Sequence, residues 1–145
     1  MPREVCATSY KADAMRIWIL DKDQTPQRFP LRRLLHEVVK ATGTEVSVCN
    51  IIRVQGNGLR INELANELDN IETISVPISE IDRLAVGVDE WFYDITAELP
   101  GTDIRFGLHD STALFVMGEP SVVEAVAAMF TNVRVDDAES VGGRG

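Results

Sequence analysis

The chain has 145 residues, of which 45% are hydrophobic and 26% are charged, and its net charge is −9. These values predict one domain over residues 1–145, with flexible ends at about 1–13 and 136–145, and exclude collagen, coiled-coil and repeat architectures. Nucleic-acid binders gather lysines and arginines because phosphate neutralisation dominates their affinity. Here 14 basic residues are dispersed among 23 acidic ones, so we expect no direct binding to nucleic acid or to an anionic membrane.

The two cysteines, Cys6 and Cys49, and the two histidines form no recognisable zinc-binding pattern. We therefore expect no metal and no cofactor. The N-terminus lacks the long apolar run of a signal peptide, and no apolar stretch approaches the length of a membrane span. These features predict a reduced, cytoplasmic protein.

The first half of the chain alternates strand-like and helix-like patterns. Residues 15–20 and 45–54 are rich in apolar and β-branched side chains and predict strands, as do residues 72–76. Pro30 can open a helix whose apolar residues recur at helical spacing up to Gly43, and Asn62 can cap a second, short helix. Residues 79–88 keep helical spacing but contain Gly87, which leaves their structure open. Gly56 and Gly58 are expected to end the second strand in a turn with positive φ.

In the second half, residues 91–99, 104–109 and 113–117 predict three strands. Pro120 then starts a helix with an apolar stripe, and residues 133–135 predict a last short strand. Together the elements predict an α+β fold with a largely antiparallel sheet and two or three helices packed on one face.

The hairpin of residues 91–109 allows a prediction of strand register. If Leu99 pairs with Ile104, one face carries only apolar side chains, and a slip of one residue would bury the charges instead. On the other face Glu98 then opposes Arg105, and Asp94 opposes His109. Strict alternation also places Phe92 on this polar face as an exposed aromatic. Gly107 is expected to leave a shallow gap beside Thr96, which makes this face a candidate docking surface.

Several groups of residues permit catalytic interpretations that the sequence does not favour. His109 and Asp110 are adjacent on a strand, so they point to opposite faces, and residues 110–111 suit a tight turn. No nucleophile elbow of the GxSxG type is present. His36 lies among charged residues on the predicted first helix, where a solvated face is the simplest interpretation. We therefore expect no catalytic residues.

Acidic residues are frequent in the second half of the chain, and they guide the functional hypothesis. An acidic surface can speed the encounter with a basic partner. We expect partner contacts from one group of residues around the hairpin: Asp89, Glu90, Phe92, Asp94, Glu98 and His109.

The segment from 91 to 130, WFYDITAELPGTDIRFGLHDSTALFVMGEPSVVEAVAAMF, resembles small α+β immunity proteins of bacterial contact-dependent and polymorphic toxin systems. The resemblance covers under half of the chain and rests on size, acidity and the order of a hairpin and a helix. It implies a cytoplasmic inhibitor that binds a cognate toxin domain, often a basic nuclease, and blocks its active site. No individual site residue follows from this resemblance.

Two other classes of function stay open at this point. The first is a regulatory or enzymatic domain that binds a small molecule on the sheet face around Asp94 and His109. The second is a subunit that contributes only structure to a larger assembly. Convergence of Asp94 and His109 in a deep pocket would favour the first.

Overall fold

The computed structural model describes residues 14–22, 29–43, 45–86 and 88–136. The strands are β1 (Met15–Ile19), β2 (Val48–Asn57), β3 (Ile74–Pro77), β4 (Trp91–Glu98), β5 (Arg105–His109), β6 (Ala113–Gly118) and β7 (Val133–Asp136). The helices are α2 (Leu31–Thr42), α3 (Leu59–Leu68), α4 (Ile78–Ala85) and α5 (Pro120–Ala127). This is the α+β class that the sequence predicts, with one more helix than expected because residues 78–85 are helical.

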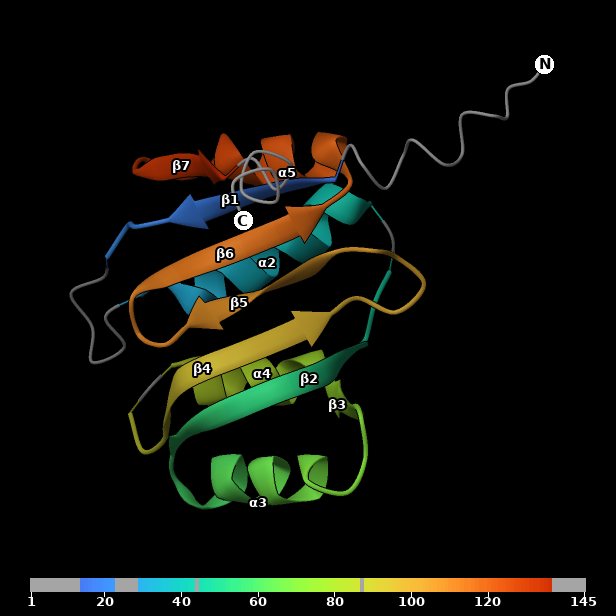
Figure 1. Ribbon diagram of the computed structural model, residues 1–145, viewed down its shortest axis with the longest axis vertical. Coiled ribbons are helices and arrows are strands. Elements are labelled where there is room, and N and C mark those ends of the chain that lie inside the picture. The colour runs from blue at the N-terminus through green and yellow to red at the C-terminus, as the bar shows by residue number, and fades with distance from the viewer. Residues whose placement is uncertain (1–13, 23–28, 44, 87, 137–145) are drawn as a thin grey trace, which may run out of the picture.

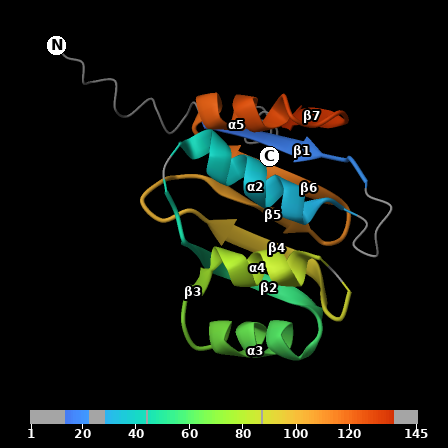
Figure 2. The same ribbon diagram turned by 180° about the vertical axis from the view of Figure 1, so that it is seen from behind.

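All seven strands form one antiparallel sheet in the order β3-β2-β4-β5-β6-β1-β7. Helices α2, α4 and α5 lie across one face of this sheet, as Figure 2 shows from the helical side. Figure 1 shows the opposite face, over which no described helix lies, and places α3 at the end of the molecule beside β2 and β3. The fold therefore has two layers, with one sheet face uncovered by the described residues.

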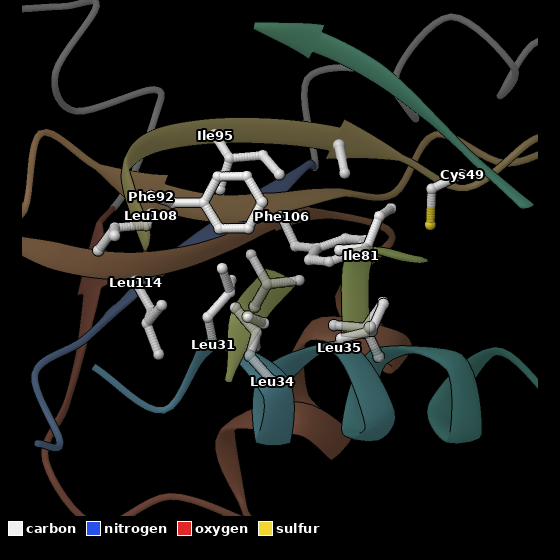
Figure 3. Packing of buried hydrophobic residues seen from close by; sticks show 14 of the residues in the cluster. Leu31, Leu34, Leu35, Cys49, Ile81, Phe92, Ile95, Phe106, Leu108 and Leu114 are labelled. Carbon is white, nitrogen blue, oxygen red and sulfur yellow. The ribbon is translucent and has the colours of Figure 1, made fainter. Parts of the chain in front are cut away.

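The hydrophobic core fills the space between the sheet and its helices. Leu31, Leu34 and Leu35 of α2 point toward Phe106 and Leu108 of β5, and all five side chains are buried (Figure 3). Proline at the start of α2 and the left-handed Gly43 at its end match the predicted boundaries of this helix. The apolar side chains that recur at helical spacing along α2 thus pack this helix against the middle of the sheet.

The predicted register of the hairpin is confirmed. Ile95 pairs with Leu108, Ala97 with Phe106 and Glu98 with Arg105. The backbone N–H of Leu99 donates to the carbonyl of Ile104 across 3.1 Å.

Strict alternation fails at the start of β4, and the prediction that Phe92 is exposed is wrong. Asp94 pairs with Gln55 of β2 while Phe92 pairs with Gly56, so Tyr93 is an extra residue in the strand. This β-bulge reverses the direction of the side chains that precede it. Phe92 is consequently buried in the core at 2% exposure, and Tyr93 is 45% exposed.

Other differences concern the ends of elements. β2 continues through Gly56 to Asn57, and only Gly58 of this segment has a positive φ. Gly56 is needed because a Cβ there would lie 2.3 Å from the carbonyl oxygen of Trp91. Asp136, expected in the flexible C-terminal end, instead completes β7. The remaining ends expected to be flexible, 1–13 and 137–145, lie outside the described residues.

Candidate interaction surfaces

The sheet face opposite the helices, here called the open face, combines an apolar centre with a charged surround. Strand pairing places its side chains in rows that cross the sheet. The central row, from β2 to β7, is Arg53, Thr96, Gly107, Phe115, Trp18 and Arg134. The neighbouring row is Asn50, Glu98, Arg105, Met117, Arg16 and Asp136.

Aromatic rings gather on the β5, β6 and β1 part of the open face. The ring centroid of Trp18 lies 5.6 Å from that of His109 and 6.0 Å from that of Phe115. The Phe115 ring also approaches Gly107, since a Cβ on this glycine would lie 3.3 Å from it. Gly107 is buried, and the shallow gap predicted beside Thr96 is therefore not open.

Asp136 fixes the Trp18 indole at the β7 side of the open face. Its carboxylate accepts hydrogen bonds from Nε1 of Trp18 at 2.9 Å and from Nε of Arg16 at 2.7 Å. The indole hydrogen bond, with the Arg16 guanidinium, holds the pKa of the Asp136 carboxyl below its usual range. The Arg16 guanidinium also lies over the indole, 5.2 Å from its centroid.

Asp94 is the one buried charged residue of the described chain, at 4% exposure. One carboxylate oxygen lies 3.1 Å from Nε of Arg53, and the other accepts the backbone N–H of Asp110 at 3.0 Å. These contacts join β2, β4 and the turn between β5 and β6. Both carboxylate oxygens of Asp94 are therefore engaged by other residues of the fold, and Arg53 compensates its negative charge.

The predicted pair of Asp94 and His109 is not among the contacts of the described residues. Asp94 bonds to Arg53 and Asp110, whereas the His109 ring packs near Trp18. Glu98 forms the predicted ion pair with Arg105, whose Nε lies 3.3 Å from the carboxylate. The two carboxylates expected to attract a basic partner from this hairpin thus both face arginines.

Asp89 and Glu90 precede β4, and only one of them is exposed. Oε1 of Glu90 accepts the backbone N–H of Ile61 at 2.9 Å, which satisfies a free donor in the first turn of α3. Gly58 makes room for this side chain, because a Cβ there would lie 2.2 Å from the Glu90 side chain. Asp89 is exposed to solvent.

A stronger acidic surface lies on α3 and the loop that follows it. We call it the acidic edge; its exposed carboxylates are Glu63, Glu67, Asp69 and Glu72. Glu63 contacts Arg60 at 3.2 Å, and the described residues give the other three no ion pair. This surface was not predicted from the sequence, where the contacts were expected from the acids around the hairpin, although the i, i+4 spacing of Glu63 and Glu67 is visible there.

Exposed apolar side chains border the acidic edge. Leu59, at the start of α3, is 78% exposed, and Ile71, beyond its end, is 50% exposed. The backbone N–H of Ile71 donates to the carbonyl of Glu67, which continues the helical turn. Leu59, Glu63, Glu67 and Ile71 therefore follow one another at intervals of four along this edge.

Arg60 connects the acidic edge to α4. Its Nε donates to Glu80 across 2.7 Å, and Arg83 lies 3.5 Å from the same carboxylate. The hydrogen bond from Arg60 lowers the pKa of the Glu80 carboxyl, and the same hydrogen bond raises the pKa of the Arg60 guanidinium. Since Arg60 is engaged by Glu80 as well as Glu63, it neutralises little of the acidic edge.

The remaining side chains with reactive groups, Cys49 and His36, have contacts that give them a structural role. Burial raises the pKa of the Cys49 thiol to about 12, so it stays protonated at neutral pH. His36 is exposed on α2, as the sequence predicted, and its Nε2 lies 2.8 Å from Asp82, which also accepts a hydrogen bond from Arg32. Within the described ranges, no three His, Cys, Asp or Glu side chains are placed to hold a metal ion.

No helix in the described part of the chain is long and apolar enough to span a membrane. Comparison with known proteins found no matching family model, no matching curated protein and no matching solved structure. The similarity to immunity proteins therefore stays a prediction.

Proposed function

We propose that this protein acts by binding a basic protein partner through the acidic edge, as an immunity protein binds and neutralises a toxin domain. The partner would be a protein whose own function requires positive charge, such as a nuclease domain that holds phosphate. Occupation of that positive surface by carboxylates would block access to it.

The proposal depends on where negative charge is left uncompensated. Arg53 and Arg105 face the acids of the hairpin, Asp94 and Glu98. Glu67, Asp69 and Glu72 have no such partners among the described residues and lie within one short segment. This contrast is the observation that carries the proposal, and it moves the predicted contact surface from the hairpin to α3.

The spacing of the acids supports a binding role over a stabilising one. Glutamates at i and i+4 of a helix repel each other and lower its stability. The exposed Leu59 and Ile71 can supply apolar anchors at the two ends of the same surface. Carboxylates would then steer the encounter, and apolar contacts would slow dissociation.

The small-molecule alternative receives less support. It requires Asp94 and His109 to converge, whereas Asp94 is held by Arg53 and Asp110. Nucleic-acid binding on the open face is also disfavoured, because Arg16, Arg53 and Arg105 each face a carboxylate of the protein.

Capture from the source cell with the full-length tagged chain tests the proposal. The test variant is Glu67→Lys with Glu72→Lys, and the control is Glu45→Lys with Glu124→Lys, which changes net charge equally at exposed sites outside the acidic edge. We expect the wild type and the control to retain one basic protein that the test variant loses. Equal retention by both variants would contradict the role of the acidic edge.

A further inference from the structure

We propose that β7 is the contact strand of a weak homodimer, in which the β7 strands of two copies pair antiparallel and join two sheets edge to edge. The occupant of this edge is a second copy of the chain. The inference concerns the end of the sheet that lies away from the acidic edge, and it does not depend on the proposed function.

The outer edge of β7 carries backbone hydrogen-bonding groups that β1 does not use. The N–H of Leu20 donates to the carbonyl of Asn132, which continues the register of the β1–β7 ladder by one residue. In an antiparallel ladder, hydrogen-bonded pairs alternate with pairs that are not hydrogen-bonded. Every second residue of β7, namely Val133 and Val135, therefore directs its N–H and C=O away from β1, toward the outer edge.

β7 also lacks the features that usually protect an edge strand from pairing. Such strands are commonly blunted by proline or lysine, or covered by another element. β3, at the other end of the sheet, ends in Pro77 and contacts α3 and α4, whereas β7, with the sequence VRVD, contains neither proline nor lysine. Val135 is 66% exposed, although Ile17 opposite it on β1 is buried. An apolar side chain is thus exposed at the outer edge.

The charges of β7 are self-complementary in a register that uses these backbone groups. A twofold axis perpendicular to the sheet at Val135 lets this residue exchange two N–H···O bonds with Val135 of the second copy. The same rotation sets Arg134 opposite Asp136 of the second copy, twice by symmetry. An axis at Val133 would instead set Arg134 opposite the uncharged Asn132, so charge favours the register centred on Val135.

Both charged groups are available for this contact. Arg134 is exposed and forms no ion pair among the described residues. Asp136 is held by Trp18 and Arg16, but these contacts, at 2.5–2.9 Å, all end on one carboxylate oxygen, Oδ2. The described residues give Oδ1 no hydrogen bond, so this oxygen can accept one from the Arg134 guanidinium of the second copy.

The position of β7 limits the repulsion between two copies. Each chain has a net charge of −9, but the acidic edge lies beside β2 and β3, at the far end of the sheet from β7 (Figure 1). Strands spaced about 4.8 Å apart separate β3 from β7 by roughly 29 Å, well beyond the Debye length of about 8 Å at physiological salt. Two copies joined through β7 therefore keep their acidic edges far apart.

The small size of the contact indicates a weak dimer. Each copy contributes one strand of four residues. The area that such a pair covers is far below the roughly 800 Å² per partner of a standard interface. We therefore expect a dissociation constant between about 0.1 and about 1 mM.

Sedimentation equilibrium of the full chain, from about 20 μM to about 1 mM, tests the proposal. The wild type should dimerise as its concentration rises. Arg134→Glu sets a carboxylate against Asp136 of the second copy and should weaken the dimer at least about tenfold. Lys40→Glu makes the same change of net charge at an exposed site on α2 and should weaken the dimer much less.

A second pair of variants adds positive charge instead. Val135→Lys places two like charges beside each other at the twofold axis and should abolish the dimer, although it lowers the net negative charge of the chain. Val88→Lys makes the same change at an apolar side chain that is 63% exposed, and it should leave the dimer intact.

Hydrogen exchange of single amides in the wild type shows whether β7 is the strand that pairs. The N–H of Val135 should become protected in proportion to the fraction of dimer, whereas the N–H of Arg134, which faces β1, should be protected in the monomer as well. A monomer throughout the concentration range would overturn the proposal. So would a dimer in which the Val135 N–H stays unprotected, or one equally sensitive to both members of either pair of variants.

Discussion

The carboxylate of Asp94 accepts the backbone N–H of Asp110 across 3.0 Å. This bond attaches the turn between β5 and β6 to the middle of the sheet. The adjacent N–H of Ser111 donates to the carbonyl of Tyr93, the extra residue of the β4 bulge. A bulge in one strand and a turn in the next hairpin thus support each other.

Asp94→Asn tests the structural role of this carboxylate. The amide keeps the shape of the side chain but loses the ion pair with Arg53, and it leaves a buried polar group less well satisfied. We expect the free energy of unfolding to fall by about 1–3 kcal/mol. Urea denaturation measures this loss, and Asp89→Asn, at an exposed site, should change stability by less than about 0.5 kcal/mol.

Ser111→Gly should stabilise the protein. Asp110 and Ser111 have φ values of 50° and 58°, and the Thr112 N–H donates to the His109 carbonyl, so the turn is of type I′. Glycine adopts positive φ without the steric cost that serine has. We expect a gain of about 0.5–1 kcal/mol in urea denaturation. Thr112→Gly, one residue beyond the turn's centre, should reduce stability instead.

Gly107→Ala should be among the most disruptive small substitutions. A Cβ at this position would lie 1.7 Å from the carbonyl oxygen of Ile95, and backbone cannot move aside as a flexible side chain can. We expect a loss of at least about 3 kcal/mol or failure to fold. Gly43→Ala is the comparison: its φ is 72°, but a Cβ there meets nothing within 4 Å. Its loss in thermal or urea denaturation should be about 1 kcal/mol.

Asp136→Asn should remove a contribution to stability that depends on pH. The pKa of Asp136 is lowered in the folded protein, chiefly by the hydrogen bond from Trp18. Its stabilising effect is therefore complete above the ordinary aspartate value of about 3.9 and is lost as pH falls through the folded pKa. The wild type should exceed the variant in free energy of unfolding at pH 7, and the difference should shrink below about pH 4. A difference that grows in acid would contradict this assignment.

The sequence predicted the parts of the fold that depend on local patterns. The apolar period of α2 and the alternation of residues 95–99 and 104–108 each identify one buried face, which determines the helix and the hairpin register. The position of Phe92 was mispredicted because the bulge at Tyr93 depends on pairing with Gly56 of a strand distant in sequence.

The distribution of charge was less accessible from the sequence than the fold. Asp94 and Glu98 look like free acids along the chain, but Arg53 and Arg105 reach them only once the strands are paired. Arg53 of β2, the strand beside α3, pairs with Asp94, and among the described residues the acids of α3 meet only Arg60 of the same helix. A count of acids by sequence position therefore could not locate the uncompensated surface.

The most direct test of the account is the rate at which the wild-type chain associates with its captured partner across a series of salt concentrations. Capture through the acidic edge predicts that the association rate falls steeply as ionic strength rises, and that Glu67→Lys with Glu72→Lys makes this dependence shallow or reverses it. The control with Glu45→Lys and Glu124→Lys should keep most of the wild-type dependence. An association rate that does not change with salt, or that both variants alter equally, would contradict the proposed function.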